Sequence, residues 1–259
     1  MRRALTIFAL VLVAALTVAA QDGPRPVGYL AEFRVLPGEG EQFVDLVKKY
    51  DKPLFDGLAA EGVVLAWGLD TPVVHQEGGM THMLWWVTAD FAGMDRVFAG
   101  FAAMEVSDED EKAFQEIIDH NKHHDHLVRS IIVNVSEDEP AGRTYTVWSF
   151  VQVKRGKGSE WRKLFEKYTK PVLDQLVADG DLVGYGVDVE WIHTDDPGWR
   201  AIWAVTTSMA AFDKLDAAFR AAGQARSEEE RGAIGHMFRK ITKGSSHRDS
   251  LWRSISLDD

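Results

Sequence analysis

The chain has 259 residues, 46% of them hydrophobic, with 29 Lys and Arg against 40 Asp and Glu and no cysteine. This composition is typical of a globular protein with one large or two small domains, and it excludes fibrous, disordered and disulfide-stapled chains. The net charge of -11 argues against nucleic acid as a partner, because an acidic surface repels a polyanion.

The chain begins with a segment typical of an export signal. Arg2 and Arg3 precede an apolar run, and Ala19 and Ala20 are small residues of the kind that a signal peptidase reads. Residues 1–20 are therefore predicted to be removed, which gives a periplasmic or secreted protein without membrane association. The alternative is an uncleaved anchor, but the apolar run is shorter than the about 20 residues needed to span a bilayer.

The segments that follow predict strands and helices in a regular order. Alternation of apolar residues indicates strands, and apolar residues at helical spacing indicate a long helix that Pro53 should kink about one turn earlier. Gly78 and Gly79 predict the turn of a hairpin. The predicted elements are a strand at 29–35, a helix at 43–58, strands at 63–69 and 80–88, helices that begin after Asp90 and Ser107, and a strand at 127–135.

The same pattern then occurs a second time. Residues 27–103 align without a gap on residues 145–221 at an offset of 118, with 23 identities in 77 positions. The acidic segment 136–143 is predicted to link a first repeat at 21–135 to a second at 144–259. The recurring pairs include Tyr50 with Tyr168, Gly68 with Gly186, Asp70 with Asp188, His75 with His193, and Trp85 with Trp203.

The order βαββαβ is the ferredoxin-like pattern. A four-stranded antiparallel sheet with helices on one face leaves its other face apolar, and two such faces bury each other when they pack together. The chain thus resembles the dimeric α/β-barrel superfamily as a fused member, an α+β fold in which two tandem ferredoxin-like repeats form one barrel around a pseudo-twofold axis. The resemblance implies a monomer with an internal pseudo-dimer, and a higher oligomer is left open as the alternative. Known members include cofactor-free monooxygenases, peroxidase-like and chlorite-dismutase-like haem proteins, and small-molecule binders.

Aromatic residues in the predicted strands favour a ligand site between the two sheets. Their rings could stack on a flat apolar molecule there, or they could simply fill the barrel. Arg129 and Arg253 alternate with apolar residues in the final strands, where a buried guanidinium needs a carboxylate or an anionic ligand. For Tyr50 and Tyr168, core packing is the favoured alternative. The predicted ligand-binding residues are Tyr50, Trp67, Trp85, Arg129, Tyr168, Tyr185, Trp203 and Arg253.

Two carboxylate and imidazole pairs are the catalytic candidates. They are Asp70 with His75 and Asp188 with His193, because a carboxylate can orient a histidine as a general base. A spacing of five places the two members on opposite faces of a continuous strand, so solvated hairpin residues are the preferred interpretation.

The metal candidates lie in the histidine-rich segment 120–126. On a helix, His120 and His124 would share a face and, with His123, could bind a divalent metal, whereas haem would need one histidine on an apolar face. No metalloenzyme spacing such as HExxH is present, so a solvated helix end is favoured. We predict no metal and no cofactor, with haem or a divalent metal as the less favoured alternative.

Three functions remain open from the sequence. The leading hypothesis is an exported α/β-barrel protein that binds a small aromatic or apolar molecule. The second is an enzyme, either a cofactor-independent monooxygenase or a haem-dependent peroxidase-like protein, because the resembled superfamily contains both. The third is a non-catalytic module that binds a protein partner.

Overall fold

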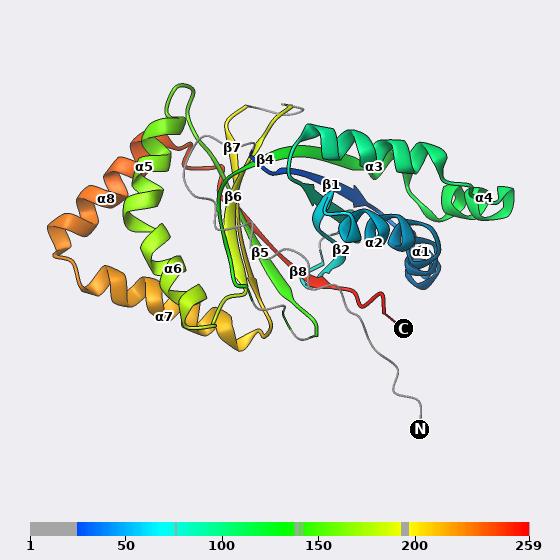
Figure 1. The fold of residues 1–259 in the computed structure, drawn as a ribbon. Coiled ribbons are helices and arrows are strands. Elements are labelled where there is room, and N and C mark those ends of the chain that lie inside the picture. Colours follow the sequence, from blue (N-terminus) through cyan, green and yellow to red (C-terminus); the bar gives the residue numbers. More distant parts are fainter. Residues whose placement is uncertain (1–24, 76, 138–139, 141, 193–196, 259) are drawn as a thin grey trace.

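The computed structural model describes residues 25–75, 77–137, 140, 142–192 and 197–258. The export signal predicted at residues 1–20 lies outside this part. Strands pair in the order β1-β3-β2-β8-β5-β7-β6-β4 and close an antiparallel barrel, with helices on two opposite sides of it (Figure 1). Among the described residues, no helix has both the length and the apolar character needed to cross a membrane.

The two halves of the chain contain similar series of elements. The first half contains β1 (Val27–Phe33), α1 (Gly40–Leu46), a π-helical turn η1 (Val47–Asp51), α2 (Lys52–Ala60), β2 (Val64–Pro72), β3 (His82–Thr88), α3 (Phe91–Ala103), α4 (Asp108–Ile117), a short 3-10 helix η2 (His120–Lys122) and β4 (His124–Val135). The second half contains β5 (Tyr145–Gln152), α5 (Gly158–Tyr168), α6 (Lys170–Ala178), β6 (Gly184–Glu190), β7 (Trp199–Thr206), α7 (Ala210–Gln224), α8 (Glu228–Ile241) and β8 (Arg248–Ser254).

The last strand of each half closes the barrel. Within the halves, the strand orders are β4-β1-β3-β2 and β8-β5-β7-β6. In addition, β4 pairs with β6, and β8 pairs with β2 over Asp70–Pro72. The βαββαβ prediction is therefore consistent with the strand order in both halves, and the predicted α+β barrel is confirmed.

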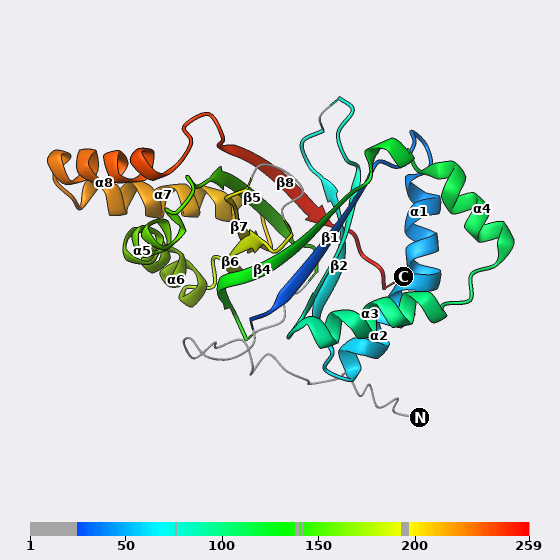
Figure 2. The same ribbon diagram turned by 90° about the horizontal axis from the view of Figure 1, so that it is seen from above.

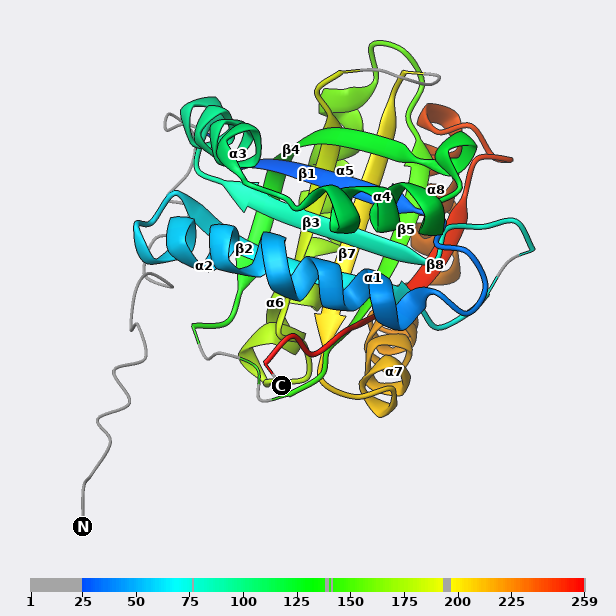
Figure 3. The same ribbon diagram turned by 90° about the vertical axis from the view of Figure 1, so that its right-hand side faces the viewer.

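Three apolar clusters hold these layers together. One lies between the first sheet and α1 to α4, and a second lies between the other sheet and its helices. A third cluster joins strands of both sheets inside the barrel, with Met83, Trp148 and Trp252 among its buried members. Figures 2 and 3 show how the two helical layers lie on the outer faces, so each sheet has a helix-covered face and a face toward the barrel interior.

Candidate functional site

Trp85 contacts both Gly68 and Asp70, which lie on the neighbouring strand of the first sheet. A Cβ atom at Gly68 would lie 2.9 Å from Cζ2 of the Trp85 indole, so glycine is what allows the ring to lie across β2. The indole Nε1 then donates to Oδ2 of Asp70 at 3.1 Å. Asp70 is 5% exposed, and this burial raises its pKa to about 7.

The second half contains the same unit with one more donor. Trp203 Nε1 donates to Oδ2 of Asp188 at 3.0 Å, and Ser130 of β4 donates to its Oδ1 at 2.7 Å. A Cβ atom at Gly186 would collide with the Trp203 indole. Burial raises the pKa of Asp188 to about 6, against the lowering effect of its two donors.

The predicted pair of Asp70 and His75 is not brought together. Asp70 is buried, whereas His75 is exposed beyond the end of β2, and no hydrogen bond or ion pair joins them. Asp70 and Asp188 each accept a hydrogen bond from an indole of the adjacent strand, and Asp188 also accepts one from Ser130. His193 lies outside the described residues.

The tryptophans between the two sheets belong to one apolar cluster. Trp85 and Trp203 join Trp148, Trp252 and Met83 in the cluster inside the barrel. This arrangement supports the alternative that indoles fill the barrel, and the two cavities described below lie on the helical sides of the sheets. Close packing explains why the indoles fill the barrel, because interdigitated side chains leave little space between two sheets.

Two other predicted ligand residues are part of the helix-side cores. Trp67 stacks on Phe55 of α2 with ring centroids 5.0 Å apart. Tyr185 is fully buried, and its hydroxyl donates to Asp174 of α6 at 2.5 Å. Both rings therefore fix helices onto strands.

Arg129, Arg253 and Tyr168 also lie outside the two cavities. The guanidinium of Arg129 lies 4.4 Å from the ring centroid of Trp191 and 5.1 Å from that of Phe91. Arg253 is half-buried in β8. Tyr168 at the end of α5 contacts the guanidinium of Arg226 at 5.4 Å. The guanidinium of Arg129 thus stacks on two aromatic rings, and its Nε atom is buried without a hydrogen-bond partner among the described residues.

The histidine-rich segment does not form the predicted helix. His120 lies in η2 and contacts the Gln115 carbonyl at 2.8 Å, whereas His124 begins β4 and is exposed. The shared helical face expected for these two residues is therefore absent. His123 stacks on Phe33 with ring centroids 4.5 Å apart. Within the described residues, no three His, Cys, Asp or Glu side chains are grouped as a metal site would require.

One cavity on the helical side of the first half combines apolar walls with ionisable groups. It has a volume of about 380 Å³. Its walls come from α1, η1, α4 and the segment that joins α3 to α4. The lining residues are Leu46, Tyr50, Asp51, Met104, Val106, Asp110, Glu111 and Phe114.

The π-helical turn η1 carries Tyr50 and Asp51 into this cavity. Pro53 lacks a backbone N–H, so the helix cannot continue with regular hydrogen bonds through the preceding turn. The kink predicted from Pro53 takes the form of η1, and π-helical turns are frequent at functional sites. In the second half α5 ends at Tyr168 and α6 begins at Lys170, without a π-helical turn between them.

The two aspartates of the cavity differ in their surroundings. Asp110 accepts hydrogen bonds at 2.6 Å from Lys49 Nζ, Ser107 Oγ and Tyr50 Oη, and these donors hold its pKa well below the usual range. Asp51 has no hydrogen bond or ion pair to any described residue, and burial raises its pKa to about 7. One carboxylate is thus a fixed anion, and the other exchanges a proton near neutral pH.

Sequence reasoning did not find Asp51. It predicted Tyr50 as a ligand residue, and Tyr50 does line the cavity. Asp51 follows it directly, but at the aligned position of the second half the residue is Thr169. The available signal was this difference between the two aligned segments, beside Tyr, Lys and Pro residues that occur in both.

The closed barrel with helices on two sides is the fold of the dimeric α/β-barrel proteins. No family model matches the sequence, and no curated protein matches it. Among solved structures, a protein from Fusobacterium nucleatum assigned as a monooxygenase is similar with a TM-score of 0.59 and 9% identity, covering 90% of this chain and 93% of that one.

Two further solved structures share the fold. A heme-binding protein from Thermus thermophilus has a TM-score of 0.53 and 11% identity, covering 90% of this chain and 93% of its own. A mutant chlorite dismutase from Candidatus Nitrospira defluvii has a TM-score of 0.52 and 12% identity, covering 92% and 94%. These likenesses show the fold.

The comparisons correct the prediction that the protein uses no cofactor. That prediction is contradicted because structures of this fold include a heme-binding protein and chlorite dismutase. The described residues, however, do not fit a haem. Neither cavity is lined by a histidine, His82 packs against Phe43, and Trp161 and Phe165 fill the space beneath the second helical layer.

Proposed function

We propose that the chain is a monooxygenase-like enzyme whose active site is the cavity of α1, η1 and α4, with Asp51 as the general base. The observation that carries this proposal is a half-buried carboxylate without an ion-pair partner, set among the apolar side chains of Leu46, Met104 and Phe114. The assignment of the Fusobacterium nucleatum protein of the same fold supports the reaction class. This proposal replaces ligand binding between the sheets as the main interpretation.

The chemistry requires an apolar substrate with a weakly acidic C–H bond. With a pKa of about 7, Asp51 is half ionised at neutral pH, which is the condition under which a general base is most effective. The proton passes to the Asp51 carboxylate, and the electron pair of the C–H bond stays on carbon. With molecular oxygen as co-substrate, the overall reaction converts a methylene and O₂ into a carbonyl and water, so each product receives one oxygen atom.

Tyr50 and Asp110 form the polar edge of the same cavity. The Tyr50 hydroxyl is fixed by its 2.6 Å hydrogen bond to Asp110, which in turn is held by Lys49 and Ser107. This network keeps the phenol ring in one orientation, and a fixed ring beside Phe114 can position a flat substrate.

Anthrone is a suitable probe because its methylene group is bonded to two aryl rings that are conjugated with a ketone, and this makes the C–H bond weakly acidic. Oxygen uptake and anthraquinone formation are measured above the uncatalysed rate. We expect kcat to rise with pH through about 7 as Asp51 ionises. Asp51→Asn should lower kcat by at least about 100-fold, which is the size of a general-base contribution.

Asp45→Asn is the matched control. Asp45 is exposed on α1, six residues before Asp51, so this variant loses the same charge without changing the cavity. An Asp51→Asn enzyme with unchanged kcat and pH profile contradicts the proposal. So does an equal loss of activity in both variants, because only Asp51 lines the cavity.

The organisation of the chain leads to a second, separate proposal. The gapless alignment of residues 27–103 with 145–221 and the equivalent strand orders of the two halves support an origin by duplication of one ferredoxin-like unit. Such a chain has a pseudo-twofold axis through the barrel.

A further inference from the structure

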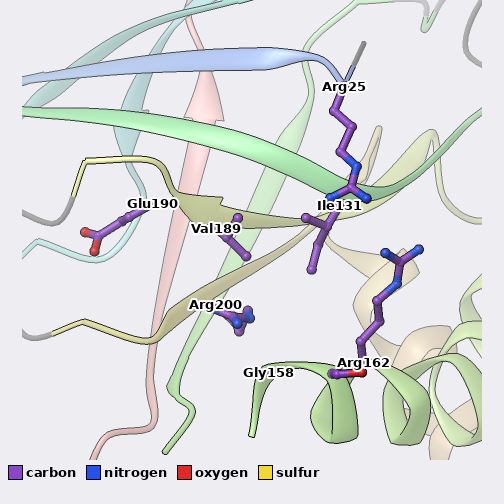
Figure 4. A pocket seen from close by; sticks show the side chains of 8 residues that line it. Arg25, Ile131, Gly158, Arg162, Val189, Glu190 and Arg200 are labelled. Carbon is purple, nitrogen blue, oxygen red and sulfur yellow. The ribbon is translucent and has the colours of Figure 1, made fainter. Parts of the chain in front are cut away.

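A second cavity, distinct from the proposed active site, lies on the helical side of the second half. It has a volume of about 440 Å³ and is bounded by β4, β6, β7, the start of α5 and the segment before β1. Figure 4 shows three arginines around it, Arg25, Arg162 and Arg200, with Ile131 and Val189 between them. Ile131 is the extra residue of the bulge in β4, and it lines the cavity.

The charge of Arg200 is not balanced by the described residues. Its Nε atom is buried without a hydrogen-bond partner, and its Nη1 donates only to the neighbouring Trp199 carbonyl at 2.8 Å. Burial lowers the pKa of its guanidinium. Arg162 is paired with Glu166 at 2.7 Å, whereas no described carboxylate lies within ion-pairing distance of Arg25 or Arg200. A half-buried cation with a buried, unpaired Nε atom is stabilised when an anion joins it.

The first turn of α5 adds further positive potential. Lys157 at its N-cap provides no side-chain cap, so the first backbone N–H groups lack that partner. A Cβ atom at Gly158 would lie 2.8 Å from Nη2 of Arg200, which places the guanidinium directly against this turn. A helix start attracts anions and repels cations. An anion bound beside Arg200 and this turn would therefore interact favourably with both.

Glu190 also borders the cavity but does not balance these arginines. Figure 4 shows its carboxylate directed away from Arg25, Arg162 and Arg200. The carboxylate lies 3.8 Å from Nδ1 of His126, and Glu190 and Glu32 raise the pKa of that imidazole to about 9. Glu190 thus belongs to a charge network on the other side of the strand.

The first half shows what this position looks like without a charge. At the offset of 118, Arg200 and Gly158 correspond to His82 and Gly40. His82 packs against Phe43 with centroids 4.8 Å apart, and burial lowers its pKa to about 4, so the ring is neutral. A neutral, packed side chain is therefore sufficient for the fold here, and the arginine of the second half has another role.

We propose that this second cavity binds a small organic carboxylate, held by Arg200, Arg25 and the first turn of α5, with its apolar body on Ile131 and Val189. Guanidinium groups match the planar geometry of a carboxylate. A cavity of about 440 Å³ with an apolar floor exceeds what an inorganic anion fills, which favours an organic ligand.

Isothermal titration calorimetry with benzoate tests this assignment on the full chain. Benzoate should bind, and benzamide, which has the same shape without the charge, should bind at least about tenfold more weakly. Arg200→Gln should also weaken benzoate binding by about tenfold or more. Benzamide binding as tight as benzoate, or no benzoate binding at millimolar concentration, would overturn the proposal.

Two further variants separate binding from folding. Arg25→Gln removes a charge from an exposed segment and should weaken benzoate binding even if Arg200→Gln fails to fold. Arg220→Gln, on the exposed face of α7, is the control and should leave binding unchanged. Equal loss in Arg220→Gln, or inorganic phosphate binding more tightly than benzoate, contradicts the site as assigned. Anthrone oxidation is measured in parallel with benzoate binding. Because the two cavities are separate, each proposal is then tested by its own measurement.

Discussion

Asp70 gives the sharpest test of the packing inside the barrel. Its carboxylate accepts one hydrogen bond from Trp85, and burial raises its pKa from 3.8 to about 7. The folded state therefore binds this proton more tightly than the unfolded chain does. Between pH 3.8 and about 7 the stability falls as the pH rises, and above about 7 both states are ionised and the loss is complete.

The magnitude follows from the pKa values of the folded and unfolded states. A difference of one between them corresponds to about 1.4 kcal/mol, so Asp70 lowers the wild-type free energy of unfolding by about 3 kcal/mol between pH 5 and pH 8. Asp70→Asn removes this loss, and the amide oxygen can still accept from the indole. Asp188→Asn should remove a smaller pH-dependent loss of stability, about 1 kcal/mol over the same range, because the pKa of Asp188 is about 6.

Urea unfolding followed by tryptophan fluorescence at pH 5 and pH 8 measures both effects. We expect the Asp70→Asn variant to gain stability relative to wild type as the pH rises, and to gain more than Asp188→Asn. A stability difference that stays constant between the two pH values would refute the reasoning. A larger effect at Asp188 would show that its two donors do not favour its ionised form.

Two other substitutions test the structure by thermal unfolding. Gly186→Ala should lower stability by about 1–3 kcal/mol because its Cβ atom would collide with the Trp203 indole, whereas Gly57→Ala, with no atom near its Cβ position in α2, should not destabilise. Burial keeps the His82 ring neutral in the folded state with a pKa of about 4, so wild-type stability falls by about 3 kcal/mol as the pH drops below 6.5. His82→Gln should remove this acid-induced loss. Identical acid unfolding of the wild type and the variant would contradict this.

The sequence predicted the order of elements because that order depends on local patterns. Period-two alternation, the Gly78-Gly79 turn and the cap at Ser107 each act over a few residues, and the strands and α4 follow them. The error at His124 has the same origin. Alternation in β4 begins three residues earlier than predicted, so polar histidines assigned to a helix end belong to a strand.

The candidate sites were harder to predict because they depend on contacts between distant residues. Asp70 meets Trp85 across a strand pair, whereas the sequence directed attention to the nearer His75. The walls around Asp51 include Met104, which follows α3, and Phe114, which lies in α4. Spacing along the chain contains no information about such neighbours until the register of the strands and the packing of the helices are known.

Recurrence between the two halves separates residues needed for the fold from residues available for function. Gly68 and Trp85 recur as Gly186 and Trp203 because each sheet needs the same close approach of an indole to a strand. Lining residues of the two cavities include positions where the halves differ. Asp51 corresponds to Thr169 and Arg200 to His82, and Asp51 and Arg200 each line the cavity of their own half.

This contrast has a physical basis. An unpaired carboxylate beside apolar walls and an unpaired guanidinium against a helix start both reduce stability, since burial disfavours the charged form. Thr169 and the neutral His82 show that the same fold accommodates side chains without that penalty. Two destabilising groups, each at the edge of a cavity and each in only one half, are therefore better explained by separate ligands than by the requirements of the barrel.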